Sequence, residues 1–343
     1  MIIYFGVLMK NNLAGKVSFK FKPFLMLVAV FSSTLSWGVG AGIQEEKEAG
    51  MIDYNLGYVV DAIPKLEEAA EEGDVEAMYY LGESYRLTHM GMTSDAMEWY
   101  LQAAEHSDPY AMLRLWGGGA CVAGDYCPED ADGWREKALA EQLPLAEDGD
   151  AEAMLALYYI YGALDDSDEG NEWLERAANK GNPEAQHRLS TMIRDGYGFY
   201  WSDSHRSDAA VEWARKAAEQ GYVPAMNTLF ALLSNIGDVK DGWDWLVKAS
   251  DRGFLDARLN VGSCYFNPDK RGGFCFVEQD KVKGWAIFHA ANAETGSNTS
   301  QSLLRLNRDD ITYEERQEAE ALAEGEWLNH GPPLSNFPPK YGF

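Results

Sequence analysis

The sequence predicts an all-α protein, a right-handed α-solenoid of about six helix-pair repeats with a C-terminal capping helix. A small-residue motif recurs at successive spacings of 34, 42, 32, 40 and 32 residues, with its alanines at Ala77, Ala111, Ala153, Ala185, Ala225 and Ala257. A tryptophan on a predicted helix follows each motif, at Trp99, Trp134, Trp173, Trp213, Trp245 and Trp285. Repeat lengths in this range are typical of helix pairs that stack on their neighbours to bury a continuous core.

Residues 1–41 are predicted to be a secretory signal peptide. The first 22 residues contain four lysines and no acidic residue, an apolar stretch begins at Phe24, and Val39-Gly40-Ala41 offers a small-residue cleavage site. The apolar stretch is short for a membrane span. We therefore expect export to the periplasm or the exterior, with no stable membrane insertion after cleavage; an uncleaved anchor helix is the alternative. Residues 42–58 are predicted to be an N-terminal linker.

The chain is strongly acidic, with 29 basic and 55 acidic residues and a formal charge of −26. Removal of residues 1–41 takes away four lysines and no acidic residue, so the remaining chain has 25 basic residues and a charge near −30. Nucleic acid is excluded as a partner, because phosphate binding draws on clustered Lys and Arg. The charge favours solubility of a long surface, or a basic partner.

Residues 59–310 are predicted to form the solenoid, in which each unit has a small-residue helix, a variable loop and a second helix. Alanine and glycine on the first helix, such as Ala77, Gly82, Ala257 and Gly262, let neighbouring helices approach closely. The second helix ends in Ala-Ala, and a glycine then stops it. An acidic residue is placed to start each second helix as its N-cap or in its first turn, at Asp95, Asp168, Asp208, Asp241 and Asp280.

The recurring pattern Ala…Leu-Gly…Tyr…Asp…Ala…Trp…Ala-Ala…Gly resembles the SEL-one-like repeat (SLR), a relative of the tetratricopeptide repeat. The resemblance covers roughly residues 60–300. It departs from the pattern at Trp116, which replaces the expected glycine, and at Ser300, which replaces an alanine. It implies an α-solenoid that acts as an adaptor or scaffold, and exported members of the family include cysteine-stapled and envelope-assembly proteins.

The end of the chain is predicted to close the solenoid. Residues 311–330 are expected to be a capping helix, because Thr312 and Glu315 have the spacing of a capping box. His330-Gly331-Pro332-Pro333 stops this helix, and residues 331–343 are expected to be an extended, proline-rich tail.

The four cysteines form two local pairs, which are predicted to be the disulfides Cys121–Cys127 and Cys264–Cys275. Local pairs in an exported protein favour disulfides. A metal site would need two-residue spacing within each pair, and the gaps here are five and ten residues. Each bond would close a loop within one unit.

No sequence motif predicts catalysis, a cofactor or a metal. Gly117-Gly118-Gly119 lacks the Gly-Lys-Ser/Thr of a phosphate loop, no histidine pair has metal-ligand spacing, and no Gly-x-Ser-x-Gly is present. The protein is therefore expected not to be an enzyme. A hydrolase of envelope material, with its catalytic residues assembled from distant positions, is the least favoured alternative.

Two surfaces are candidates for binding. By analogy with the tetratricopeptide pattern, the exposed positions on the concave face of the first helices would be Tyr79, Glu83, Arg86, His187, Thr191, Asn227 and Ser263. They vary between units while the packing positions stay small, as expected for a recognition surface. The second surface is an aromatic loop, with Tyr197, Phe199, Tyr200 and Trp201. We expect an envelope scaffold that binds a protein or peptide on the concave face; a polysaccharide-binding protein that uses the aromatic loop is the alternative.

Overall fold

The computed structural model describes residues 31–117, 131–271, 273–328 and 331–341. The chain divides into two compact parts, residues 1–42 and 43–343. Residues 1–30 of the predicted signal peptide and both cysteines of the predicted Cys121–Cys127 disulfide lie outside the described residues. In the described part, all regular elements are helical, and the extended pairing is one isolated parallel bridge between Phe254 and Ser335.

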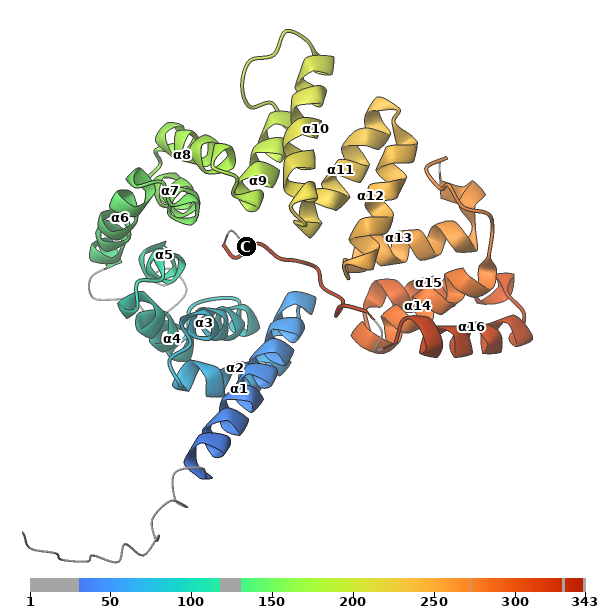
Figure 1. Cartoon of the computed structure of the whole chain (residues 1–343), viewed down its shortest axis with the longest axis horizontal. Helices are drawn as coiled ribbons and strands as arrows, with labels where there is room; N and C mark the ends of the chain where they lie inside the picture. The colour runs from blue at the N-terminus through green and yellow to red at the C-terminus, as the bar shows by residue number, and fades with distance from the viewer. Residues whose placement is uncertain (1–30, 118–130, 272, 329–330, 342–343) are drawn as a thin grey trace, which may run out of the picture. The chain divides into compact units, whose positions relative to one another are not determined.

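The second part, residues 43–343, is a succession of helix-pair repeat units, in which each helix packs mainly against its neighbours in the sequence (Figure 1). The first helices of the units are α3 (Val75–His89), α5 (Pro109–Gly117), α7 (Ala151–Ala163), α9 (Pro183–Arg194), α11 (Val223–Ile236) and α13 (Leu255–Phe266). The second helices are α4 (Ser94–Glu105), α6 (Ala131–Glu147), α8 (Ser167–Asn179), α10 (Asp203–Glu219), α12 (Val239–Asp251) and α14 (Lys281–Thr295). Before and after them come α1 (Phe31–Leu56), α2 (Val59–Glu71), α15 (Asn298–Leu306) and α16 (Tyr313–Glu326), with short 3-10 turns η1 (Pro268–Arg271) and η2 (Arg308–Asp310). The predicted all-helical, helix-pair fold is confirmed.

The junction between units is built from a few residues, as the sequence predicted. The Ala69-Ala70 pair ends α2, Gly73 takes a φ of +95°, and the Asp74 side chain accepts a hydrogen bond from the backbone N–H of Ala77 at the start of α3. A left-handed residue of this kind is easiest for glycine. Positive φ recurs at the other junctions, at Ser107, Gly149, Gly181, Gly221, Gly253 and Gly296.

Close helix packing explains the small residues and the tryptophans. A Cβ at Gly82 would lie 2.8 Å from the Tyr100 ring, and one at Gly262 would lie 2.8 Å from Ile287. Because atoms cannot approach so closely, both positions require glycine for the helices to pack as they do. All six predicted tryptophans lie on second helices, where Trp173, Trp245 and Trp285 are buried and Trp99, Trp134 and Trp213 are half-buried.

The prediction of a linker over residues 42–58 was wrong. These residues belong largely to α1, which packs on α2 and α3. The Cα of Gly50 faces Leu66 of α2 so closely that a Cβ would lie 2.9 Å from it, and the buried Tyr54 contacts the ring of Tyr80 on α3 at 4.8 Å. Lys47 of α1 also forms ion pairs with Asp74 at 2.7 Å and with Glu76 at 2.9 Å. None of the described helices combines the length and apolar character needed to cross a membrane.

Other details of the sequence prediction have mixed outcomes. The Cys264–Cys275 disulfide is confirmed, with a Cα–Cα distance of 5.4 Å. The capping helix is confirmed as α16, and Thr312 and Glu315 form the predicted reciprocal capping box. Asp208 is not at a helix start, because α10 begins five residues earlier at Asp203, where the Ser202 side chain caps it.

Candidate functional site

The C-terminal segment, residues 331–341, lies extended against the first helices, a surface that we call the A-helix face (α3, α5, α7, α9, α11 and α13). Its first half is attached to the start of α13. Ser335 donates a backbone hydrogen bond to Gly253 at 2.9 Å and accepts one from Leu255 at 3.0 Å. The next residue, Asn336, donates its backbone N–H to the carbonyl oxygen of Asn55 in α1 at 3.1 Å. The segment is therefore extended, as predicted, but it is packed on the fold.

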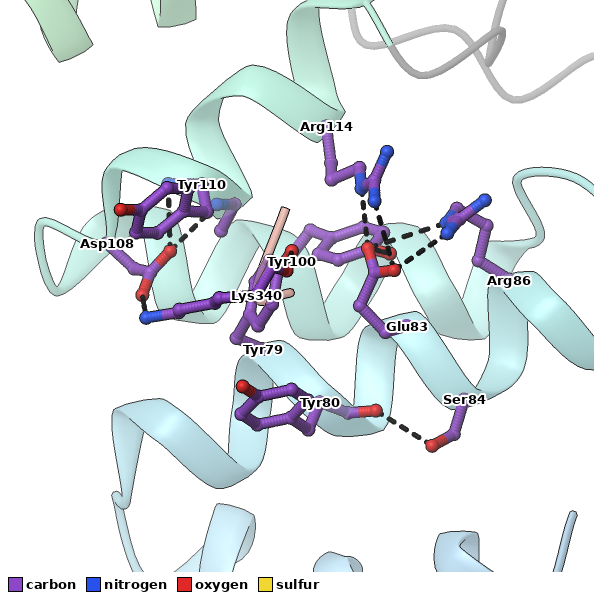
Figure 2. Close-up of polar contacts among 11 residues, drawn as sticks. Tyr79, Tyr80, Glu83, Ser84, Arg86, Tyr100, Asp108, Tyr110, Arg114 and Lys340 are labelled. Atoms are coloured by element: carbon purple, nitrogen blue, oxygen red, sulfur yellow. Dashed lines mark hydrogen bonds and ion pairs between the residues drawn. The ribbon is translucent and has the colours of Figure 1, made fainter. Parts of the chain in front are cut away.

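Lys340 is held by groups from two units (Figure 2). Its carbonyl oxygen accepts a hydrogen bond of 2.6 Å from the Tyr79 hydroxyl on α3, and its Nζ lies 3.0 Å from an Asp108 carboxylate oxygen. The same ammonium group lies 5.2 Å from the centre of the Tyr79 ring and 4.7 Å from that of Tyr110, within the range of a cation–π contact. Two further hydrogen bonds fix Asp108, because its other carboxylate oxygen caps α5 by accepting from the backbone N–H groups of Tyr110 and Ala111.

Tyr341 lies in an aromatic and cationic setting beside Lys340. Its ring centre is 5.9 Å from that of Tyr110 on α5 and 5.2 Å from that of Tyr159 on α7. The Arg114 guanidinium lies 4.5 Å from the centre of the Tyr341 ring. Rings at these separations attract through their quadrupoles, and a cation near a ring face adds to the attraction. Together, the groups around Lys340 and Tyr341 form what we call the Lys-Tyr site.

A buried carboxylate positions Arg114 (Figure 2). Glu83 is 0% exposed and accepts hydrogen bonds from Arg114 at 2.5 Å, from Arg86 at 2.7 Å and from the Tyr100 hydroxyl at 2.6 Å. Burial by itself would raise the pKa of Glu83, but the two guanidinium groups and the Tyr100 hydroxyl outweigh it and lower this pKa. Glu83 is thus an ionised anchor that fixes two arginines.

A cavity of about 470 Å³ lies farther along the A-helix face, between α9 and the C-terminal segment. Its walls are mostly aromatic and charged: Tyr158, Glu184, His187, Arg188, Thr191, Met192, Asp195, Tyr197, Tyr222, Pro224, Phe337 and Pro339. His187 bonds Thr228 through Nε2 at 2.9 Å. Burial, helped by the charges of Arg188 and Arg194, lowers the pKa of His187 to about 4, so the imidazole is neutral at pH 7.

The predicted residues of the concave face have different environments. Tyr79 contacts the C-terminal segment, and His187 and Thr191 line the cavity. Asn227 is half-buried on α11. The expected exposure was wrong for Tyr79, which is fully buried, and for Glu83, which the arginines cover. It was also wrong for Ser263, whose buried hydroxyl donates to the Leu259 carbonyl at 2.8 Å. Arg86 is largely covered too, because it pairs with Glu83.

The aromatic loop divides into two packed and two exposed side chains. Tyr197 is half-buried and donates to Glu175 at 2.8 Å, and Tyr200 lies under the Arg206 guanidinium at 5.0 Å. Phe199 and Trp201 are 81% and 87% exposed and contact each other edge to face, with ring centres 5.4 Å apart.

Sequence reasoning missed the residues that receive the C-terminal segment, namely Asp108, Tyr110, Arg114 and Tyr159. Asp108 had a signal, since it occupies the junction position that Asp74, Asp150 and Asn182 occupy in other units. The tyrosines also had one, because Tyr79-Tyr80 and Tyr158-Tyr159 place adjacent tyrosines on first helices. Within the described residues, no cluster of three or more His, Cys, Asp and Glu side chains is arranged to hold a metal ion.

No family model matches the chain. An uncharacterised protein of Neisseria meningitidis serogroup B is 26% identical over 199 residues, which cover 49% of this chain and 40% of that protein. Two solved structures are similar. One, a protective antigen of uropathogenic Escherichia coli described as displaying an SLR fold, is 23% identical with a TM-score of 0.47 and is matched over 86% of this chain and 62% of its own. The other, a Sel1 repeat protein from Oxalobacter formigenes, is 21% identical with a TM-score of 0.41, over 72% of this chain and 98% of its own.

The chain thus spans less than two thirds of the length of the Neisseria and Escherichia coli proteins. Both solved structures are described as SLR or Sel1 repeat proteins, the repeat that the recurring residues of this chain resemble.

Proposed function

We propose that the protein is an exported, non-catalytic interaction scaffold that binds an extended polypeptide on its A-helix face. One observation carries the proposal: an extended segment of eight residues, 334–341, already lies on this face with its own backbone and side-chain contacts. A solenoid that stacks repeats offers long surfaces of this kind, and recognition residues can vary there while the packing residues stay constant.

The contacts are those expected for recognition of a polypeptide. Ser335 and Lys340 are held through their backbone atoms, which any residue type could supply. Leu334 and Tyr341 are held through their side chains, Leu334 in the core near α14 and α16 and Tyr341 among aromatic rings. Backbone contacts supply affinity and side-chain sites supply specificity in peptide recognition of this kind.

Export is supported by two features. The basic, apolar and small-residue regions of residues 1–41 have the order of a secretory signal. The Cys264–Cys275 disulfide fits an oxidising compartment such as the periplasm or the exterior. Fractionation of the native host, followed by mass measurement of the N-terminus, tests both: a cytoplasmic protein with an intact N-terminus would contradict export.

The binding proposal is tested with a chain that stops after Asn336 and a fluorescent peptide of residues 331–343. This truncation keeps Leu334 and the backbone bonds of Ser335, so the fold should be retained, which circular dichroism checks. We expect saturable binding by fluorescence anisotropy. Tyr79→Phe should weaken binding about 2-fold to 10-fold, because one hydrogen bond contributes about 0.5–1.5 kcal/mol. Trp201→Ala is the matched control and should bind as the unsubstituted truncated chain does.

A folded truncated chain that binds no peptide, or binds it equally with Tyr79→Phe, would overturn this assignment of the A-helix face. A loss caused by Trp201→Ala would move the binding site to the aromatic loop. That loop remains a second candidate, because Phe199 and Trp201 are exposed apolar rings on a protruding turn. Stacking of sugar rings on such side chains is the alternative function, and retention on immobilised polysaccharide that is lost with Phe199→Ala and Trp201→Ala tests it.

A further inference from the structure

We propose that residues 337–341 are a built-in competitor for the A-helix face, and that the partner that displaces them carries the same chemistry: an extended, proline-containing segment in which Lys or Arg precedes an aromatic residue. This inference rests on the proposed function and adds two things to it, the chemical class of the partner and its regulation by the chain itself. It follows from the Lys-Tyr site and from the unequal attachment of the two halves of the C-terminal segment.

The position of Lys340 selects for a cation. The Asp108 side chain is only 6% exposed, and its second oxygen is left for the Lys340 ammonium group once the first has capped α5. The faces of Tyr79 and Tyr110 complete the site, and ring faces attract cations. A neutral side chain at this place would leave a buried carboxylate oxygen without its ionic partner, which is costly.

Further acidic groups favour positive charge in the same place. Burial raises the pKa of the Tyr110 hydroxyl, and the nearby carboxylates Glu184, Glu152 and Asp108 raise it further. The positive charge of Lys340 in turn acts on Glu152, where it opposes the effect of burial on that carboxyl's pKa. The neighbouring cations pair with other carboxylates and leave Asp108 to Lys340: Arg114 and Arg86 bind Glu83, and Arg188 binds Tyr159 and Glu184.

The position of Tyr341 selects for an aromatic ring. Tyr110 and Tyr159 surround it at centre distances of 5.9 and 5.2 Å, and Arg114 lies over it. Because Glu83 fixes Arg114 through two hydrogen bonds, this cation is already oriented toward the ring. An aliphatic residue would keep the apolar contact but lose the ring–ring and cation–ring attraction.

The two halves of the segment differ in how firmly they are attached. Leu334 and Ser335 are 3% and 6% exposed, and backbone bonds to Gly253 and Leu255 hold Ser335. From Phe337 onward the residues are half-buried, and Pro338 and Pro339 have no N–H to donate. Phe337 takes a φ of +48°, which is an uncommon backbone conformation for a residue with a side chain. Residues 334–336 therefore form an anchor, and residues 337–341 form the part that a partner can displace.

Competition within the chain has a measurable consequence. A tethered segment acts at a high effective concentration, so a free peptide must compete with it. If the segment occupies the Lys-Tyr site in about 90% of molecules, the apparent affinity of the full chain for a free peptide falls about tenfold. Removal of residues 337–343, or loss of the two side chains in place, restores that affinity.

The experiment compares four proteins against one fluorescent peptide of residues 337–343. They are the full chain, the chain that stops after Asn336, the full chain with Lys340→Gln and Tyr341→Ala, and a control full chain with Lys270→Gln and Tyr313→Ala. The control removes the same two side-chain types from exposed positions outside the C-terminal segment, where Lys270 and Tyr313 are 72% and 64% exposed. We expect the truncated and the doubly substituted chains to bind at least about tenfold more tightly than the full chain and its control.

Peptide variants test the chemistry on the truncated chain. Lys340→Arg and Tyr341→Phe should retain binding within about threefold, whereas Lys340→Gln and Tyr341→Leu should each weaken it about tenfold or more. Equal binding of all variants would overturn the stated partner chemistry but leave the proposed peptide-binding function in place. Equal affinity of full and truncated chains would overturn the competition. If circular dichroism shows that the truncated and the doubly substituted chains are folded but neither binds the peptide, the proposed function is overturned as well.

Discussion

The hydroxyl of Tyr79 donates a hydrogen bond of 2.6 Å to the carbonyl oxygen of Lys340, 261 residues farther along the chain. This bond joins the first helix of an early repeat to the C-terminal segment. In a repeat protein most contacts link neighbouring units, so stability is close to a sum of local terms. Here the C-terminal segment adds contacts between α3, α5, α7 and α13 that the stacking alone does not make. Displacement of the segment should therefore change the coupling between units as well as open the face.

Replacement of the buried carboxylate Glu83→Gln should destabilise the protein by about 3 kcal/mol, because Arg114 and Arg86 would then lack the charge that compensates their burial. Urea unfolding measures this free energy. The matched control is Glu212→Gln, whose side chain is 67% exposed and pairs with Lys216 one turn away. Exposed pairs contribute little, so this variant should change stability by less than about 0.5 kcal/mol. An equally small change for Glu83→Gln would show that the arginines find other partners or water.

The helix-pair fold could be predicted because its signals are local. The Ala-Ala pair, the left-handed junction residue and the capping Asp or Asn lie within a few residues of one another, and most junctions repeat at least two of them. Tyr222 and Phe254 replace the capping residue before α11 and α13, but the left-handed residues Gly221 and Gly253 remain. Even Ser107, which replaces glycine, keeps the junction conformation at a φ of +69°. The linker over residues 42–58 was misjudged because its charged residues hide the packing of Gly50 on α2 and of Tyr54 against Tyr80 of α3, which depends on neighbouring helices.

The candidate site could be predicted only in part, because it is assembled from distant residues. Tyr79 was found from its place on the first helix. The pairing of Lys340 with Asp108 spans 232 residues and has no repeat signal, so no local pattern reveals it. Glu83 was expected to be exposed by analogy with the tetratricopeptide pattern. Tyr100 of α4 and Arg114 of the next repeat cover it, and only the stacked structure shows these contacts.

Gly253→Ala should destabilise the protein by about 1–2 kcal/mol more than Gly237→Ala. Both glycines have positive φ, +85° and +92°, so an alanine costs about 1 kcal/mol at each for conformational reasons. A Cβ at Gly253 would also clash with the Pro333 carbonyl oxygen, whereas nothing lies within 4 Å of one at Gly237. The excess reflects displacement of the C-terminal segment and loss of its backbone bonds to α13. Equal effects in denaturant unfolding would mean that the segment contributes no stability there.

Loss of the disulfide through Cys264→Ala and Cys275→Ala should reduce stability by about 2–3 kcal/mol, since the bond closes a short loop within one unit. The expected effect is modest because a short loop removes little entropy from the unfolded chain. Unfolding with and without a reductant measures it: the reductant should destabilise the parent protein more than the variant. Mass mapping of non-reduced peptides then decides whether Cys121 and Cys127 pair with each other, as the sequence predicts, and a cross-linked peptide containing Cys121 and Cys264 would refute both assignments.

The free energy of unfolding should decrease as the pH is lowered from about 6.5 to 4, in part because of His187. Its pKa is lowered from 6.5 to about 4, chiefly by burial and then by Arg188 and Arg194. The unfolded chain therefore takes up a proton as the pH drops through 6.5, while the folded chain does so only near pH 4. The resulting stability is fully present above pH 6.5 and is lost toward pH 4, by up to about 3 kcal/mol.

Carboxylates also titrate toward the lower end of this range, so the test is a difference between variants. His187→Gln keeps a side chain able to bond Thr228 but has no titrating group, and its stability should fall less steeply from pH 6.5 to 4.5 than that of the parent protein. His89→Gln, at an exposed position on α3, is the matched control and should follow the parent profile. Parallel profiles for the parent protein and His187→Gln would contradict the lowered pKa, because they would show that His187 takes up a proton as readily in the folded as in the unfolded chain. The cavity beside α9 would then be open to water, although Phe337 and Pro339 line it in the structure.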